Sequence, residues 1–85
     1  MDSPYFVYVL YSKVHKRYYT GSSSDPYKRL NGHNDPRSKG WTSRYAPWNI
    51  IHVEECDSKS DALRKEKWLK SGAGREFIKS IHFHT

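Results

Sequence analysis

The longest run of apolar and aromatic residues in the chain lies near its N-terminus, at residues 5–11. Both alternating faces of this run are apolar or aromatic, and its residue types favour β structure, so the pattern predicts a central strand covered on two sides. A polar stretch and then residues 17–20 follow, which predicts a hairpin into a second antiparallel strand that ends at Gly21. The β-branched run at residues 49–56 predicts a third strand.

The first helix signal follows the predicted hairpin. Serine and aspartate residues precede Pro26, which predicts a helix from residue 26 to about His33 or Asn34. Residues 35–48 contain two prolines, one glycine, cations and two tryptophans without clear periodicity, so we expect a long, partly ordered loop there. Loops of this length in a small domain often carry function.

Two further helices are predicted in the C-terminal third. Candidate capping residues at 57–60 predict a helix over residues 60–71, which Gly72 and Gly74 would close. The spacing of the apolar positions 77, 78 and 81 predicts a last short helix over residues 75–82 that docks on the sheet. The expected fold is α/β in the mixed α+β sense, a small three-stranded antiparallel sheet flanked by helices.

The length of 85 residues indicates one domain, residues 1–85, whose core depends on thirteen aromatic side chains. Cys56 is the only cysteine, so no intrachain disulfide can form. No apolar stretch reaches the roughly 18 residues of a membrane span, and no signal-peptide pattern is present. We therefore expect a cytoplasmic protein that has no membrane partner.

The charge of the chain points to a polyanionic partner. Fifteen Lys and Arg residues against nine Asp and Glu residues give a net charge of +6 and a pI near 9.6. Residues 13–44 hold eight basic and two acidic residues, and residues 64–79 hold six and two, whereas residues 45–63 hold one and four. This segregation suits a nucleic-acid backbone. The alternative is that the cations only keep the protein in solution.

Glu66 has an unusual place on its predicted helix. Helical spacing puts it on the same face as Ala62, Leu63 and Leu69, so a carboxylate would point toward the core. Such a group is costly unless it is paired or binds a cation. The two alternatives are a glutamate at the rim paired with a nearby Lys or Arg, and a metal-binding or catalytic glutamate.

Two more pairs of residues are candidates for a site. Arg29 and His33 are four residues apart on the first predicted helix and share a face, next to a buried stripe expected at Tyr27 and Leu30. Guanidinium and imidazole groups suit a phosphodiester. Tyr8 and Tyr19 lie on adjacent predicted strands, where their hydroxyls could converge. Incidental surface residues and ordinary core tyrosines are the alternatives.

The predicted loop interleaves cations with aromatic residues, a composition that can contact phosphates and stack on bases. The alternative is that the segment is an ordinary surface loop with Trp41 or Trp48 fixed in the core. The candidate nucleic-acid contacts on this loop and on the first helix are Lys28, Arg37, Lys39, Trp41 and Arg44. Zinc-type spacing, a P-loop and a nucleophile elbow are all absent from the sequence.

Taken together, these segments resemble the GIY-YIG nuclease superfamily, especially small stand-alone members similar to the N-terminal catalytic domain of UvrC. The two half-motifs are Val-Tyr-Val-Leu at residues 7–10 and Tyr-Tyr-Thr-Gly at residues 18–21. The helix after them carries the family arginine, and residues 39–48 and 60–71 are also similar to that subgroup. Val7 and Val9 stand where the family has glycine and isoleucine, a mild departure at packed strand positions.

This resemblance implies roles for five residues. Tyr8 and Tyr19 would line the site, Arg29 would contact the scissile phosphate, and Glu66 would bind one divalent ion, Mg²⁺ or Mn²⁺. One of the tyrosines would deprotonate or orient the attacking water, and His33 would assist as a phosphate or proton contact.

The implied function is a metal-dependent endonuclease that hydrolyses phosphodiester bonds in DNA, in repair or recombination, with RNA as a further possible substrate. Since 85 residues hold no appended DNA-reading module, a protein partner could supply the specificity. One alternative is a nucleic-acid-binding module with little or no intrinsic cleavage. Another is an adaptor that uses Trp41 and Trp48 for protein contacts.

Overall fold

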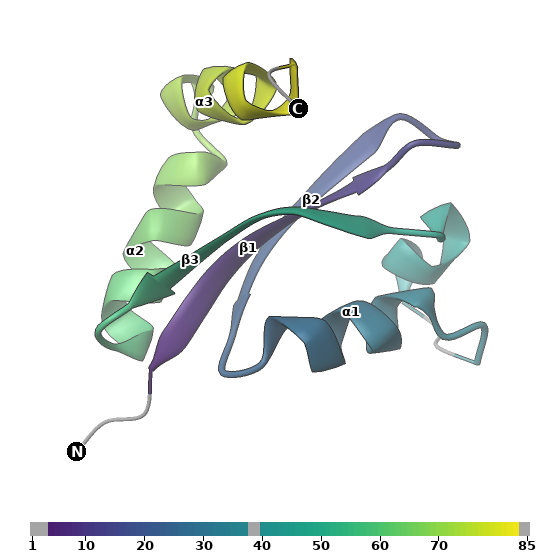
Figure 1. Cartoon of the computed structure of the whole chain (residues 1–85), viewed down its shortest axis with the longest axis horizontal. Helices are drawn as coiled ribbons and strands as arrows, with labels where there is room; N and C mark the ends of the chain where they lie inside the picture. The colour runs from purple at the N-terminus through teal and green to yellow at the C-terminus, as the bar shows by residue number, and fades with distance from the viewer. Residues whose placement is uncertain (1–3, 38–39, 84–85) are drawn as a thin grey trace.

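The computed structural model describes residues 4–37 and 40–83, and of residue 83 it describes the backbone alone. The described elements, in chain order, are β1 (Tyr5–Ser12), β2 (Arg17–Ser23), α1 (Pro26–Asn34), the 3₁₀ helix η1 (Trp41–Tyr45), β3 (Asn49–Cys56), α2 (Lys59–Leu69) and α3 (Gly72–Phe83). The strands form one antiparallel sheet in the order β2–β1–β3, with helices on both of its faces (Figure 1). The predicted mixed α+β fold is confirmed.

Strand β1 is the central strand, as its two-sided hydrophobic pattern predicted. Side chains of a strand alternate between the two faces of a sheet. Val7 and Val9 enter a hydrophobic cluster with Leu69 and Ile78 on one face. On the other face, a second cluster of buried residues consists of Tyr8, Leu10 and Trp48. All four residues of β1 from 7 to 10 are fully buried, so β1 belongs to both clusters.

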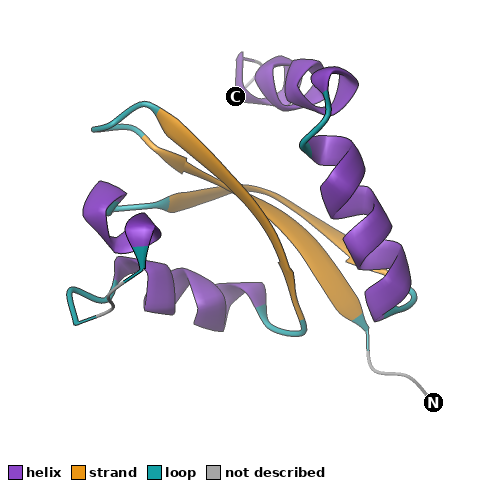
Figure 2. Cartoon of the chain, turned by 180° about the vertical axis from the view of Figure 1, so that it is seen from behind, coloured by secondary structure: helices purple, strands orange, loops and turns teal. Residues whose placement is uncertain are grey.

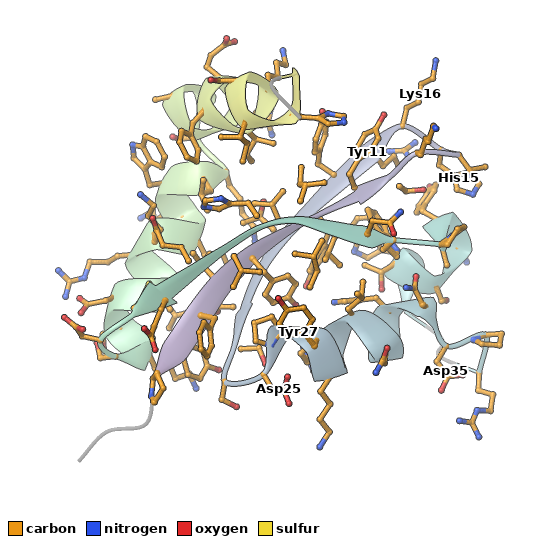
Figure 3. All side chains as sticks on the ribbon, in the orientation of Figure 1. Tyr11, His15, Lys16, Asp25, Tyr27 and Asp35 are labelled. Atoms are coloured by element: carbon orange, nitrogen blue, oxygen red, sulfur yellow. The ribbon has the colours of Figure 1, made fainter. Side chains whose placement is uncertain are left out.

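The hairpin between β1 and β2 differs from the expected one in its length and turn. Strand β2 continues past Gly21 to Ser23, because Gly21 pairs with Tyr8 and the ladder runs on to Phe6. Lys16 adopts the left-handed conformation with φ of 55°, which a tight hairpin requires even where no Asn-Gly pair is present. Figure 3 shows His15 and Lys16 at the tip of this hairpin.

Helix α1 has the predicted bounds. The Asp25 carboxylate accepts a hydrogen bond of 3.1 Å from the backbone N–H of Lys28, which caps the helix, and Asp25 lies at its start in Figure 3. Tyr27 is 64% exposed, so its expected place in a buried stripe is wrong. Pro26 and Leu30, one turn apart, take the sheet-facing positions instead.

The segment between α1 and β3 is more ordered than predicted, since it contains η1. Trp48 is buried, and its indole N–H donates a 2.7 Å hydrogen bond to the carbonyl oxygen of Thr42. The Asn34 side chain bonds both backbone groups of Trp48, at 2.6 and 3.1 Å. Trp48 is therefore the tryptophan fixed in the core, whereas Trp41 is 51% exposed.

Helices α2 and α3 pack on the face of the sheet opposite α1 (Figures 1 and 2). Leu63 is 47% exposed, so the predicted apolar face of α2 is narrower than its sequence suggested. Gly72 and Gly74 do not close α2 but belong to α3. A Cβ atom on Gly74 would overlap the backbone of Trp68 and Leu69, so only glycine permits this close corner. None of the described helices is long and apolar enough to span a membrane.

Candidate active site

The buried tyrosine of β1 reaches the first helix through its hydroxyl group. The Tyr8 hydroxyl oxygen lies 3.3 Å from Nε2 of His33. It also lies close to Gly21 in the neighbouring strand, where an added Cβ atom would stand 2.7 Å from that oxygen. Gly21 thus leaves the space through which the ring of Tyr8 extends.

His33 has a partner at each ring nitrogen. Its Nδ1 lies 2.9 Å from the Thr42 hydroxyl of η1, and its Nε2 faces Tyr8. The ring of Tyr19 lies beside the imidazole, with 4.7 Å between the ring centroids. Two hydrogen-bonding partners and a neighbouring ring hold the imidazole in one orientation. The two tautomers of His33 differ only in which partner donates to it.

Arg29 lies one helical turn before His33 and is exposed. It lines a hollow of 380 Å³ at the surface of α1 and η1, which we call the Arg29 hollow. The hollow is lined by Lys28, Arg29, Gly32, His33 and Thr42. Two cations and an imidazole at one concave surface form a site that suits an anion such as a phosphate.

The pKa values of Tyr8 and His33 are shifted in opposite directions. Burial, with a smaller contribution from Tyr19, raises the pKa of the Tyr8 hydroxyl, although a hydrogen bond from Arg29 and its positive charge act against this rise. Burial and then the charge of Arg29 lower the pKa of His33. Near neutral pH the site therefore holds a protonated tyrosine beside a neutral imidazole, which can accept a proton at its unprotonated ring nitrogen.

Glu66 approaches the site from α2. The helices that carry Arg29 and Glu66 lie on opposite faces of the sheet, because α1 and α2 pack against β1 residues of opposite parity. The charge of Glu66 nevertheless raises the pKa of Tyr8, so the carboxylate lies within electrostatic range of that hydroxyl. The Glu66 side chain is 20% exposed, and its Oε2 accepts a 2.8 Å hydrogen bond from Nζ of Lys70.

The donor groups near Glu66 limit which metal ion this site could hold. Within residues 4–37 and 40–83, no three His, Cys, Asp or Glu side chains come together as a metal cage. A single carboxylate fits an ion such as Mg²⁺ or Mn²⁺, which keeps several of its waters, and does not fit structural zinc. Such an ion would compete with Lys70 for Glu66.

The remaining candidate contacts are dispersed around this site. Lys28 lines the Arg29 hollow, and Arg44 is an exposed residue of η1. Arg37 forms a two-point ion pair with Asp35, and these hydrogen bonds lower the pKa of the Asp35 carboxyl group. Lys39 lies outside the described residues. The charge of Arg37 is thus partly neutralised within the chain.

Two polar residues of the site were not predicted from the sequence. Thr42 contacts His33 with its hydroxyl and Trp48 with its carbonyl group, and Asn34 fixes the backbone of Trp48. A lone threonine in an aperiodic segment gives no sequence signal. Asn34 could have been noticed as a polar residue at a helix end, where amides often bond backbone groups.

The model of the GIY-YIG catalytic domain matches residues 4–76 of this chain, which span every element that contributes to the site. The chain belongs to the GIY-YIG family. Its domain is thus of a nuclease type, and GIY-YIG nucleases act on nucleic acids and generally use a divalent metal ion.

Several relatives of this GIY-YIG domain are UPF0213 proteins. That of Halobacterium salinarum is 38% identical over 62% of this chain and 69% of its own length. That of Natronomonas pharaonis is 32% identical over 84% of this chain and 82% of its own. The solution NMR structure of a UPF0213 protein from Bacillus halodurans has a TM-score of 0.54 and 26% identity, over 92% of this chain and 84% of the other.

Proposed function

We propose that this GIY-YIG protein is a divalent-metal-dependent endonuclease that hydrolyses phosphodiester bonds in DNA, in repair or recombination. The observation that carries the proposal is the hydrogen-bonded pair of Tyr8 and His33 beside the cationic Arg29 hollow. This arrangement offers a phosphate site and a proton acceptor in contact with each other. Both are needed for hydrolysis of a phosphodiester by water.

The hydrolysis joins a water oxygen to phosphorus and breaks the bond from phosphorus to a sugar oxygen. Arg29 binds the phosphate and stabilises the negative charge that develops on its oxygens. The attacking water loses a proton, and neutral His33 accepts it, either directly or through the hydroxyl of Tyr8. Tyr19 is less buried than Tyr8 and lies beside the imidazole, where it orients the water.

Glu66 would hold the divalent ion. When bound, Mg²⁺ or Mn²⁺ supplies positive charge for the phosphate oxygens and the leaving group. Glu66 has a protein partner already, Lys70, which neutralises the carboxylate when no ion is bound. The half-buried position of Glu66 strengthens its attraction for a cation compared with a fully exposed glutamate.

The experiment that tests this function is nicking of supercoiled plasmid by the purified protein with Mg²⁺, with Mn²⁺ and with EDTA. Arg29→Ala and Glu66→Ala proteins, purified in the same way, serve as the matched variants. We expect metal-dependent nicking by the parent protein and its loss in both variants, while their circular dichroism spectra match that of the parent. Nicking by Glu66→Ala at the parent rate would overturn the assignment of Glu66.

A second candidate function is a nucleic-acid-binding module with little or no cleavage of its own, which a protein partner activates. The Lys70–Glu66 ion pair favours it, because the carboxylate that the reaction needs is occupied. This function predicts salt-sensitive DNA binding without metal-dependent nicking. The plasmid assay and a binding assay on the same preparation distinguish the two functions.

A further inference from the structure

A second cavity of 480 Å³ lies between β2 and the corner of α2 and α3. We call it the β2–α3 groove. Its lining is aromatic on one side, apolar at the helices and cationic at the rim, and consists of Tyr18, Tyr19, Thr20, Trp41, Leu69, Lys70, Arg75, Ile78 and Lys79. Among these described residues there is no Asp or Glu. A groove that combines aromatic and cationic groups without acids suits a polyanion that also carries rings.

Two cations of the β2–α3 groove, Arg75 and Lys79, are available for a ligand. Arg75 and Lys79 are four residues apart on α3, so they project from the same face one turn apart. Both are exposed, and neither forms a salt bridge within the described part of the chain. Lys70, at the end of α2, is a third cation in the lining, but its ammonium group is paired with Glu66. A phosphate backbone along α3 would meet the charges of Arg75 and Lys79.

The aromatic side of the groove presents a tryptophan ring in a fixed orientation. Trp41 is 51% exposed, yet its ring contacts those of Tyr19, Tyr45 and Trp48, at centroid distances of 5.9, 5.6 and 6.3 Å. These contacts hold the indole in place while about half of the residue remains exposed. A fixed, exposed indole is a stacking surface for a base whose own face is free.

Two residues of the groove contact residues of the candidate active site. Tyr19 lines the groove, and its ring lies 4.7 Å from that of His33. Lys70 lines the groove as well, and its ammonium group bonds to Glu66. A strand whose phosphate occupies the Arg29 hollow could therefore continue into the groove past Tyr19.

We propose that the β2–α3 groove binds an unpaired DNA strand next to the scissile phosphate, an inference that rests on the proposed nuclease function. In a duplex the base faces are stacked on each other and only the backbone and base edges are accessible. Trp41 can stack on a base only where the strand is unpaired, while Arg75 and Lys79 bind the phosphates of that strand. The substrate is then DNA with a single-stranded segment at the cleavage point.

The test measures binding without cleavage. Fluorescence anisotropy in EDTA compares a labelled oligothymidine of about 20 nucleotides with a blunt duplex of the same length. The groove variant is Arg75→Ala/Lys79→Ala, and the control is Lys13→Ala/Lys59→Ala, which removes the same charge from exposed positions outside the groove. Trp41→Leu is matched by Trp68→Leu, since Trp68 is also exposed, at 42%, and lies outside the groove.

We expect the groove variant and Trp41→Leu to lose about tenfold or more in affinity for the single strand, and both controls to lose about threefold or less. The salt slope of single-strand binding should fall by about 1.4 in the groove variant, for two lost phosphate contacts. Equal losses in variant and control, or equal losses for single strand and duplex, would overturn the proposal.

A measurement on the parent protein guards against variants that do not fold. In ¹⁵N NMR spectra, the indole N–H signal of Trp41 should move on addition of oligothymidine, and that of Trp68 should not. If oligothymidine binds and the indole N–H signal of Trp41 does not move, the groove proposal is overturned. Because these assays contain no metal, their result is separate from the plasmid assay, whose failure would overturn the nuclease function instead.

Discussion

Gly21 faces Tyr8 across the β1–β2 ladder, and its missing side chain leaves room for the Tyr8 hydroxyl. A methyl group in that space would push the hydroxyl away from His33, since the remaining surroundings of Tyr8 are closely packed. The glycine of the second half-motif is therefore a spatial requirement of the tyrosine in the first. It links two segments that are thirteen residues apart in the sequence.

Gly21→Ala should lower nicking activity by about 10²-fold, because displacements of about 1 Å in a reacting geometry have effects of this size. The measurement is the initial rate of plasmid nicking, with the thermal transition recorded in parallel. Gly72→Ala is the matched control, since its added Cβ meets no atom within 4 Å. Full activity in Gly21→Ala would show that the position of Tyr8 is unimportant.

Thr42→Val should lower the nicking rate by at least about tenfold, because His33 loses the partner of its Nδ1 and with it a fixed orientation. The carbonyl group of Thr42, which holds Trp48, remains in place. Thr42→Ser keeps the hydroxyl and should restore most of the rate. If both variants are equally slow, packing at residue 42 rather than its hydroxyl determines activity.

The titration of His33 should respond to Arg29. Burial and the charge of Arg29 hold the pKa of His33 below its ordinary value of 6.5, so Arg29→Ala should raise it and Arg29→Lys should leave it low. NMR titration of the imidazole signals measures this shift. If the pKa of His33 is the same in the parent, Arg29→Ala and Arg29→Lys proteins, the charge of Arg29 does not act on His33.

The same lowered pKa has a consequence for stability. The folded state binds the proton of His33 less well than the unfolded state does, so this group contributes stability above pH 6.5 that is lost as the pH falls through its lower folded pKa. Urea unfolding of the parent and of His33→Gln should therefore differ less at acidic pH than at pH 7. If the difference in unfolding free energy between the two proteins grows as the pH falls, the pKa of His33 is not lowered by folding.

Lys70→Met should strengthen Mn²⁺ binding about two- to fivefold, because Lys70 competes with the ion for Glu66 and a partly exposed ion pair contributes up to about 1 kcal/mol. Electron paramagnetic resonance titration in the absence of DNA measures this affinity directly. Glu66→Gln should abolish the specific binding. Unchanged affinity in both variants would place the ion elsewhere in the protein.

The strands and α1 were predictable because their signals are local. Residues 5–11 are apolar on both faces, and Asp25 and Pro26 mark the start of a helix with side-chain chemistry that acts within one turn. The bounds of α2 and α3 were less predictable, because Gly74 has a tertiary role. Its contact with the backbone of Trp68 depends on how two helices meet, and a glycine in a sequence is equally typical of a helix end.

The candidate site was predictable only in part. The resemblance to the GIY-YIG family pointed to five residues of the site, but not to Thr42 or Lys70. Thr42 acts through a contact with His33 that no periodicity shows, whereas Lys70 follows Glu66 by four residues, a spacing typical of ion pairs on one helix. The approach of Glu66 from the opposite face also depends on the three-dimensional packing of α2, which spacing along one helix does not determine.

Strand β1 belongs to both hydrophobic clusters, with Val7 and Val9 on one face and Tyr8 and Leu10 on the other. No layer of structure separates the residues that stabilise α2 and α3 from the residue that contacts His33. Any repacking at Val9 shifts the backbone that carries Tyr8. A substitution in β1 that changes the stability of this protein will therefore also change the position of Tyr8. Packing on one face and chemistry on the other both restrict which residues β1 can carry.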